Sequence, residues 1–156
     1  MATNGKRNKR AGHSYEQATV RLLVSRGIYP HAVTARSANR RKDSQKIDIV
    51  NISELEHGEM SDSIQTKNCC GTINYLEILK SMPRKKGIRN VVFHKRTRRA
   101  EQLFVPVGEF AFTSAEDYVE LMAYWRAFEL VRKYVDWDKL PKDIREHLLK
   151  LQVGAM

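Results

Sequence analysis

Cysteine is scarce in this chain of 156 residues, which contains only Cys69 and Cys70, side by side. Neighbouring cysteines cannot form an ordinary disulfide, and these two do not match the spacing of zinc ligands. The sequence therefore predicts neither a disulfide framework nor a zinc site. We expect a reducing, cytoplasmic setting for this protein.

Long apolar runs and acidic blocks are also absent from the sequence. No stretch approaches the roughly 20 apolar residues that a membrane helix needs. The basic N-terminus has no hydrophobic segment behind it, as a secretion signal would have. We therefore expect a soluble protein that is not secreted and has no membrane partner.

Positive charge is what the chain has in excess. It contains 28 lysines and arginines against 18 acidic residues, which gives a formal net charge of +10. An excess of this size indicates a polyanionic partner, and nucleic acid is the commonest one. The chain is 42% hydrophobic and can bury the core of one domain.

The N-terminal segment 1–12 is expected to be a flexible basic arm, because it is polar and lacks apolar periodicity. A single domain then covers residues 13–156. Its first helix is predicted to begin at Ser14, with Gln17 completing a capping box. The helix should end near Arg26, with Gly27 in the left-handed conformation after it.

Residues 47–52 predict the clearest strand, since a nearly continuous run of isoleucine and valine indicates cover on both faces. It should form a hairpin-like pair with the strand at 64–70. Further strands are predicted at 29–35, 90–94 and 102–107. Segment 36–46 is expected to be a polar loop and 54–62 an acidic turn.

Helices are predicted where capping patterns precede apolar periodicity. Asn74 and Glu77 open a short helix that must end before Pro83. A long helix begins at Ser114, and a final short helix covers 142–151. The long helix carries aromatic residues that we interpret as core, with a dimer contact as the alternative. The order of elements predicts an α/β (α+β) fold with a mixed sheet flanked by helices.

A candidate active site is formed by polar residues on two of these strands. Side chains alternate along a strand, so Gln65 and Lys67 point the same way. Asp48 stands among apolar residues on the preceding strand and can face that pair. A carboxylate, an amide oxygen and an ammonium then converge, which suits a divalent cation and a phosphate. The alternative is that Asp48 is solvated and that the pair lies on an edge strand.

Basic residues are concentrated near this site and in the arm. Those in 36–46 form a dense cationic segment suited to positioning phosphates, and those in the arm are suited to contacting a duplex. The expected DNA-binding residues are Lys6, Arg7, Lys9, Arg10, Arg36, Arg40, Arg41, Lys42 and Lys46.

The order of Glu16 in the first helix, Asp48, and Gln65 with Lys67 resembles the PD-(D/E)xK nuclease superfamily, and most closely its Holliday junction resolvases. Ser37 beside Arg36 matches a further position of that pattern. The resemblance covers roughly residues 12–95. Gln65 stands where the superfamily usually has a carboxylate. Ile47 stands where its pattern has a proline before the aspartate. A neutral amide oxygen is still an acceptable ligand for magnesium.

The resemblance implies a restriction-endonuclease-like fold with an α-β-β-β-α-β core and additional C-terminal helices. It implies a magnesium-dependent endonuclease acting on branched DNA, with manganese as a substitute, and a homodimer. The implied metal ligands are Glu16, Asp48, Gln65 and the Thr66 carbonyl. The implied role of Lys67 is to orient the attacking water, and that of Ser37 is to contact the phosphate.

Two alternatives to a junction resolvase remain open at this point. One is a non-catalytic DNA-binding protein on the same scaffold, which the substitution at Gln65 favours. The other is a nuclease for flaps, ends or duplex DNA. The expected setting is DNA repair, recombination or viral DNA processing.

Overall fold

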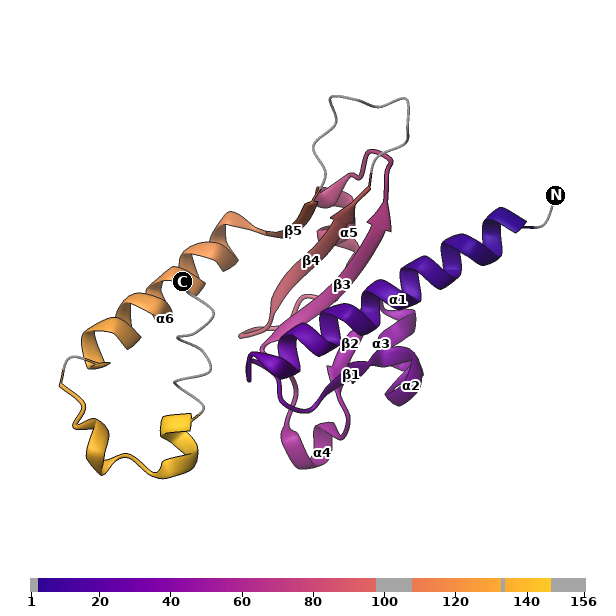
Figure 1. Ribbon diagram of the computed structural model, residues 1–156. Helices are drawn as coiled ribbons and strands as arrows, with labels where there is room; N and C mark the ends of the chain where they lie inside the picture. The colour runs from indigo at the N-terminus through magenta and orange to yellow at the C-terminus, as the bar shows by residue number, and fades with distance from the viewer. Residues whose placement is uncertain (1–2, 98–107, 133, 147–156) are drawn as a thin grey trace.

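A computed structural model describes residues 3–97, 108–132 and 134–146 (Figure 1). Its described part contains an open mixed sheet with the strand order β1-β2-β3-β4-β5. β3 and β4 run parallel, while the other neighbouring strands are antiparallel. The expectation of an α/β fold with a mixed sheet and helices is thereby confirmed at this level. The strands are β1 (Ala32–Thr34), β2 (Ile49–Asn51), β3 (Asp62–Cys69), β4 (Arg89–Arg96) and β5 (Gly108–Thr113).

The helices differ greatly in length and in how closely they contact the sheet. Helix α1 lies across the sheet, whereas α6 projects away from it (Figure 1). None of the helices in the described ranges is both long and apolar enough to cross a membrane. The helices are α1 (Thr3–Ser25), α2 (Ala35–Ala38), α3 (Arg40–Ser44), α4 (Glu54–His57), α5 (Tyr75–Ser81), α6 (Ala115–Arg132) and the 3-10 helix η1 (Trp137–Lys139).

Helix α1 begins at Thr3, not at Ser14. The expectation of a flexible arm up to residue 12 is therefore wrong from residue 3 onward. The lysines, arginines and alanine of this stretch are good helix formers. A tertiary contact also holds it, since the Asn68 side chain of β3 donates a 3.0 Å hydrogen bond to the Ala11 carbonyl. The predicted end is confirmed, because Gly27 follows the helix with φ 67°.

Two segments expected to be irregular contain short helices. Segment 36–46 forms α2 and α3, and the Asn39 side chain caps α3 by accepting a hydrogen bond from the Lys42 amide at 3.2 Å. The acidic turn at 54–62 starts with α4, whose cap is Ser53. Each of these three helices has only about one turn, which apolar periodicity cannot reveal because it needs several turns.

Several predicted elements are confirmed. β2 and β3 are antiparallel, and the Asn74 side chain accepts the Glu77 amide at the start of α5. The Ser114 hydroxyl accepts a 3.0 Å hydrogen bond from the Asp117 amide at the start of α6. The predicted strand at 102–107 lies outside the described residues. The final predicted helix is described as helical for residues 142–146.

The two faces of the sheet are packed by different groups. On the α1 face, Leu23 packs with Ile49 and Ile64. On the opposite face, Ala35 packs with Val50. Because side chains alternate along a strand, Thr66 lies on the α1 face with Ile64. Gln65 and Lys67 therefore lie on the opposite face.

Helix α6 does not bury its apolar residues within the described part of the chain. Tyr118, Leu121, Met122 and Trp125 keep between 46% and 54% of their surface exposed. The interpretation of this stripe as core is therefore wrong for the single chain. The reason is the position of α6, which extends beyond the sheet instead of packing on it (Figure 1).

Candidate active site

Asp48 lies immediately before β2, at the point where β2 and β3 separate. Its main-chain amide donates to the Ile64 carbonyl at 2.8 Å, and its carbonyl accepts from the Ala35 amide at 2.7 Å. The next hydrogen bond between the two strands is made by the Asp48 side chain and not by its main chain. Oδ2 accepts hydrogen bonds from the Thr66 amide at 2.6 Å and from the Thr66 hydroxyl at 3.1 Å. The carboxylate is therefore held at the gap between the two strands.

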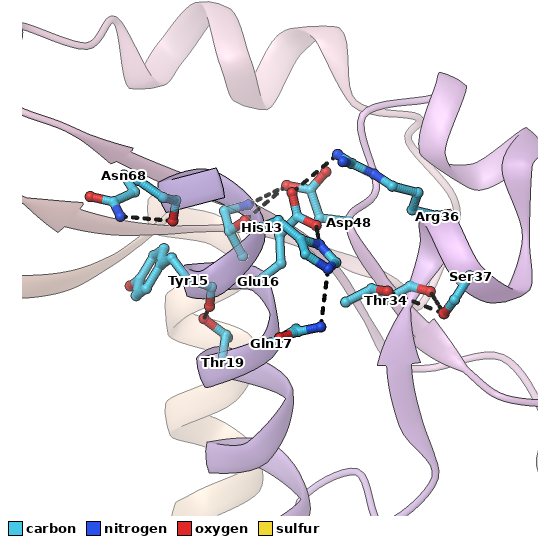
Figure 2. A network of polar contacts seen from close by, with 12 residues as sticks. His13, Tyr15, Glu16, Gln17, Thr19, Thr34, Arg36, Ser37, Asp48 and Asn68 are labelled. Carbon is cyan, nitrogen blue, oxygen red and sulfur yellow. Dashed lines mark hydrogen bonds and ion pairs between the residues drawn. The ribbon is translucent and has the colours of Figure 1, made fainter. Parts of the chain in front are cut away.

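Glu16 brings a second carboxylate to this position from α1. It is only 8% exposed. Its Oε1 accepts from Arg36 Nη2 at 3.4 Å, and its Oε2 lies 3.4 Å from His13 Nδ1. Figure 2 shows the carboxylates of Glu16 and Asp48 directed toward each other. The helix and the strand gap thus form one acidic pair with cationic groups around it.

The electrostatic environment of Asp48 reflects this arrangement. Burial raises the pKa of Asp48 above its ordinary value of 3.8. The Thr66 amide opposes that shift by hydrogen bonding to the ionised form, and the nearby charge of Glu16 raises the pKa further. The Thr66 hydroxyl and the Lys67 ammonium lower it. Lys67 is therefore close enough for its charge to favour the ionised carboxylate.

Gln65 is 4% exposed, and its Oε1 is buried without a hydrogen-bond partner among the described residues. A buried amide oxygen without a partner is costly, and a bound water or cation would satisfy it. Gln65 lies on the sheet face opposite Thr66, and no hydrogen bond joins it to Glu16 or Asp48 within the described part. Gln65 is linked to the strand gap only through the main chain, because the next residue, Thr66, contacts Asp48.

Ser37 lies beside Arg36 on α2 but is turned away from the acidic pair (Figure 2). Its hydroxyl donates to the Thr34 carbonyl at 2.7 Å and lies 3.1 Å from the Thr34 hydroxyl. Arg36, not Ser37, reaches Glu16. The predicted role of Ser37 at the phosphate has no contact to support it.

The residues fit a hard cation through a mixed ligand set. Within the described ranges, no three His, Cys, Asp or Glu residues converge to hold a metal. The oxygens at the strand gap come instead from Glu16, Asp48 and the Thr66 carbonyl. That carbonyl points to the same strand edge as the Thr66 amide, which already contacts Asp48. These carboxylate and carbonyl oxygens are of the kind that magnesium accepts, whereas Gln65 lies on the other face of the sheet.

Most of the predicted DNA-binding side chains are accessible. Lys6, Arg7, Lys9 and Arg10 are exposed on the first turns of α1, and Arg36, Arg40, Arg41 and Lys46 are exposed around α2 and α3. Lys42 differs from them: its ammonium pairs with Glu59 and, at 3.4 Å, with Glu54. The prediction that Lys42 contacts phosphate gains no support from this conformation, because two carboxylates already pair with its ammonium.

His13 is a site residue that the sequence reasoning did not identify. It contacts Glu16, and its Nε2 lies 3.0 Å from the Gln17 amide nitrogen. The spacing of three residues to Glu16 places both on one helix face. The signal was missed because the helix was expected to begin one residue after His13.

Comparisons with known proteins add no relative. No family model, no curated protein and no solved structure matches this chain.

Proposed function

We propose that this protein is a magnesium-dependent endodeoxyribonuclease that cleaves branched DNA, with a restriction-endonuclease-like fold. The observation that carries the proposal is the placement of Asp48, which Thr66 holds at the strand gap between Glu16 and the charge of Lys67. The resemblance of these residues to the PD-(D/E)xK nucleases, and to Holliday junction resolvases among them, supports the choice of chemistry. The net charge of +10 supports DNA as substrate.

Each residue of the site has a task in this proposal. Glu16, Asp48 and the Thr66 carbonyl would hold magnesium at the strand gap. When bound, magnesium supplies Lewis acidity to the scissile phosphate and lowers the pKa of water. Thr66 keeps the Asp48 carboxylate in one orientation. Lys67 orients the attacking water and offsets the negative charge that develops on the phosphate.

The exposed basic side chains position the DNA backbone. Arg36 of α2 contacts Glu16 (Figure 2), and Arg40 and Arg41 are exposed on the next helix, α3. The first turns of α1 add four exposed cations that extend from the site. Contacts of this kind fix the position of a duplex without reading its sequence. The proposal therefore concerns DNA structure and not a base sequence.

A second candidate is a non-catalytic DNA-binding protein on the same scaffold. Two observations favour it: Gln65 supplies no charge to the site, and Arg36 pairs with Glu16 at 3.4 Å. An arginine in that position competes with a cation for the glutamate. This candidate predicts DNA binding that depends on salt and no cleavage with any divalent metal.

One experiment separates the candidates. Purified protein is incubated with fixed and mobile four-way junctions, flaps and linear duplex, each with magnesium, manganese or chelator. Nicking of the junctions that stops with chelator supports the nuclease, and cleavage of another substrate redirects it to flaps, ends or duplex. Binding without cleavage in every metal supports the second candidate.

Two variants connect the activity to the site. Asp48→Ala and Lys67→Ala should abolish cleavage and leave junction binding largely unchanged. Lys80→Ala removes an exposed lysine of α5 and serves as the matched control. Full activity in both site variants would contradict the assignment, even if the protein cleaves DNA.

We also propose that two copies act together, as the resemblance implies. The exposed apolar residues of α6 offer surface for such an association. Sedimentation velocity with and without junction DNA measures the oligomeric state directly. A monomer in both conditions would contradict the proposed dimer. The proposed setting is intracellular DNA repair, recombination or viral DNA processing.

A further inference from the structure

A second group of reactive side chains lies at the end of β3, on the sheet face opposite α1. Cys69 Sγ lies 3.6 Å from His94 Nε2, and His94 Nδ1 lies 2.7 Å from the Tyr75 hydroxyl. His94 is 1% exposed, whereas both cysteines are partly exposed and neither is in a disulfide. None of these groups takes part in the site around Asp48.

The protons in this group can be placed from its contacts. His94 Nε2 also lies 3.3 Å from the Cys69 carbonyl, so this nitrogen carries the proton and donates it. Nδ1 must then accept a hydrogen bond from the Tyr75 hydroxyl. Burial lowers the pKa of His94, which keeps the imidazole neutral at neutral pH. The Nε2–H group therefore faces the region of the Cys69 sulfur as a donor.

Arg96 adds a second donor on the same side of the sheet. It is the partner of Cys69 in the parallel register of β3 and β4. Its Nε is buried and has no hydrogen-bond partner in the described part of the chain. A buried guanidinium nitrogen without an acceptor is costly. Its positive charge lies near His94, whose pKa it helps to lower, and next to Cys69 in the strand register.

We propose that Cys69 is a redox-sensitive thiol whose ionised form reacts with hydroperoxides. The thiol loses its proton to solvent, and the thiolate attacks one peroxide oxygen. An S–O bond forms and the O–O bond breaks, so sulfur is oxidised to a sulfenic acid while the peroxide is reduced to hydroxide or alkoxide. His94 Nε2–H and Arg96 stabilise the negative sulfur before the attack.

Cys70 is the internal reference for this proposal. It follows Cys69 directly and lies just beyond the end of β3. Both residues are partly exposed, so both thiols can be followed in one experiment. The proposal does not depend on nuclease activity, and its test requires no DNA.

The test labels the intact protein with limiting hydrogen peroxide in the presence of dimedone, which traps sulfenic acids. Peptide mapping by mass spectrometry then gives separate rates for the two cysteines. Cys69 should react about tenfold faster or more, which corresponds to about 1.4 kcal/mol, the size of one hydrogen bond to a charged group. Rates that differ by less, or a faster Cys70, overturn the proposal.

Two variants test the role of the hydrogen-bonded chain. Tyr75→Phe removes the hydroxyl but keeps the ring, whose centroid stacks 3.7 Å from that of Phe112. Without the hydroxyl, the imidazole proton can move to Nδ1, and the Cys69 rate should fall several-fold toward that of Cys70. Cys70→Ser should leave the Cys69 rate unchanged. An unchanged rate in Tyr75→Phe overturns the role of His94.

Discussion

The Thr66 main-chain amide donates a 2.6 Å hydrogen bond to Asp48 Oδ2, across the gap where β2 and β3 separate. A side chain thus occupies the position of a main-chain acceptor in the ladder. The contact fixes the carboxylate without using its second oxygen, Oδ1, which accepts no hydrogen bond from any described residue. The same strand edge then presents one free carboxylate oxygen and the Thr66 carbonyl to a ligand.

Asp48→Asn should raise thermal stability at neutral pH while it lowers cleavage by at least about a hundredfold, since even outer-shell partners of metal ligands cost 10- to 100-fold. The pKa of Asp48 is higher in the folded than in the unfolded protein. Its stabilising contribution is therefore complete below the unfolded value of 3.8 and is lost as pH rises through the raised folded value. Asparagine avoids this loss.

Thermal melts with chelator from pH 4 to 8 measure that effect. The melting temperature of Asp48→Asn should exceed that of the parent by on the order of a few degrees at pH 7, and the difference should shrink as pH approaches 4. Asp138→Asn, in an exposed position of η1, is the control. A variant less stable than the parent at pH 7 would show that the charge of Asp48 stabilises the fold.

Thr66→Val should raise the pH at which the cleavage rate begins to fall on acidification, which is the acid limb of the pH–rate profile. The Thr66 hydroxyl hydrogen bond lowers the pKa of Asp48, and valine removes it while the main-chain amide stays. Protonation of Asp48 then begins at a higher pH, and the ionised form needed for cleavage is lost earlier on acidification. The pH profile of junction cleavage from 5 to 8 measures the shift. Thr72→Val, at an exposed position, should leave the profile in place.

Glu16→Gln should shift the same limb in the opposite direction. The charge of Glu16 raises the pKa of Asp48, so its removal lowers that pKa and keeps Asp48 ionised to lower pH. The maximal rate should fall because one proposed ligand loses its charge. Opposite displacements in Glu16→Gln and Thr66→Val would identify Asp48 as the titrating group. Displacements of the same sign would assign the limb to another residue.

Arg41→Ala and Lys42→Ala should differ in their effect on DNA binding although the residues are adjacent on α3. Arg41 is exposed, whereas Lys42 is paired with Glu54 and Glu59. If about six charges contact phosphates, the log–log salt slope is about −5. Arg41→Ala should reduce its size by about 1, and Lys42→Ala should leave it unchanged. Filter binding between 50 and 300 mM salt gives both slopes, and equal effects would contradict the pairing of Lys42.

Local signals were sufficient for the elements whose ends depend on neighbouring residues. The Asn74 cap located α5, the Ser114 cap located α6, and Gly27 marked the end of α1. These features involve residues within one helical turn, so their chemistry is visible in the order of amino acids. The alternation that pairs Gln65 with Lys67 is equally local.

Long-range contacts were what the sequence could not show. The start of α1 involves Asn68 and Ala11, 57 positions apart. The ion pair of Lys42 involves Glu59, 17 positions away. Packing between Leu23 and Ile64 decides which face of the sheet α1 covers. Gln65 lies on the other face and is therefore separated from the helix that carries Glu16.

By itself, the sequence determined the basic charge, the residue types of the candidate site and the elements that carry them. Only the tertiary structure decided that Asp48 meets Glu16 and Thr66, that Arg36 reaches Glu16 in place of Ser37, and that α6 leaves its aromatic face exposed. The physical reason is that charge and helix caps are properties of neighbouring residues. Hydrogen bonds across strands and burial against the sheet arise only when distant segments pack together.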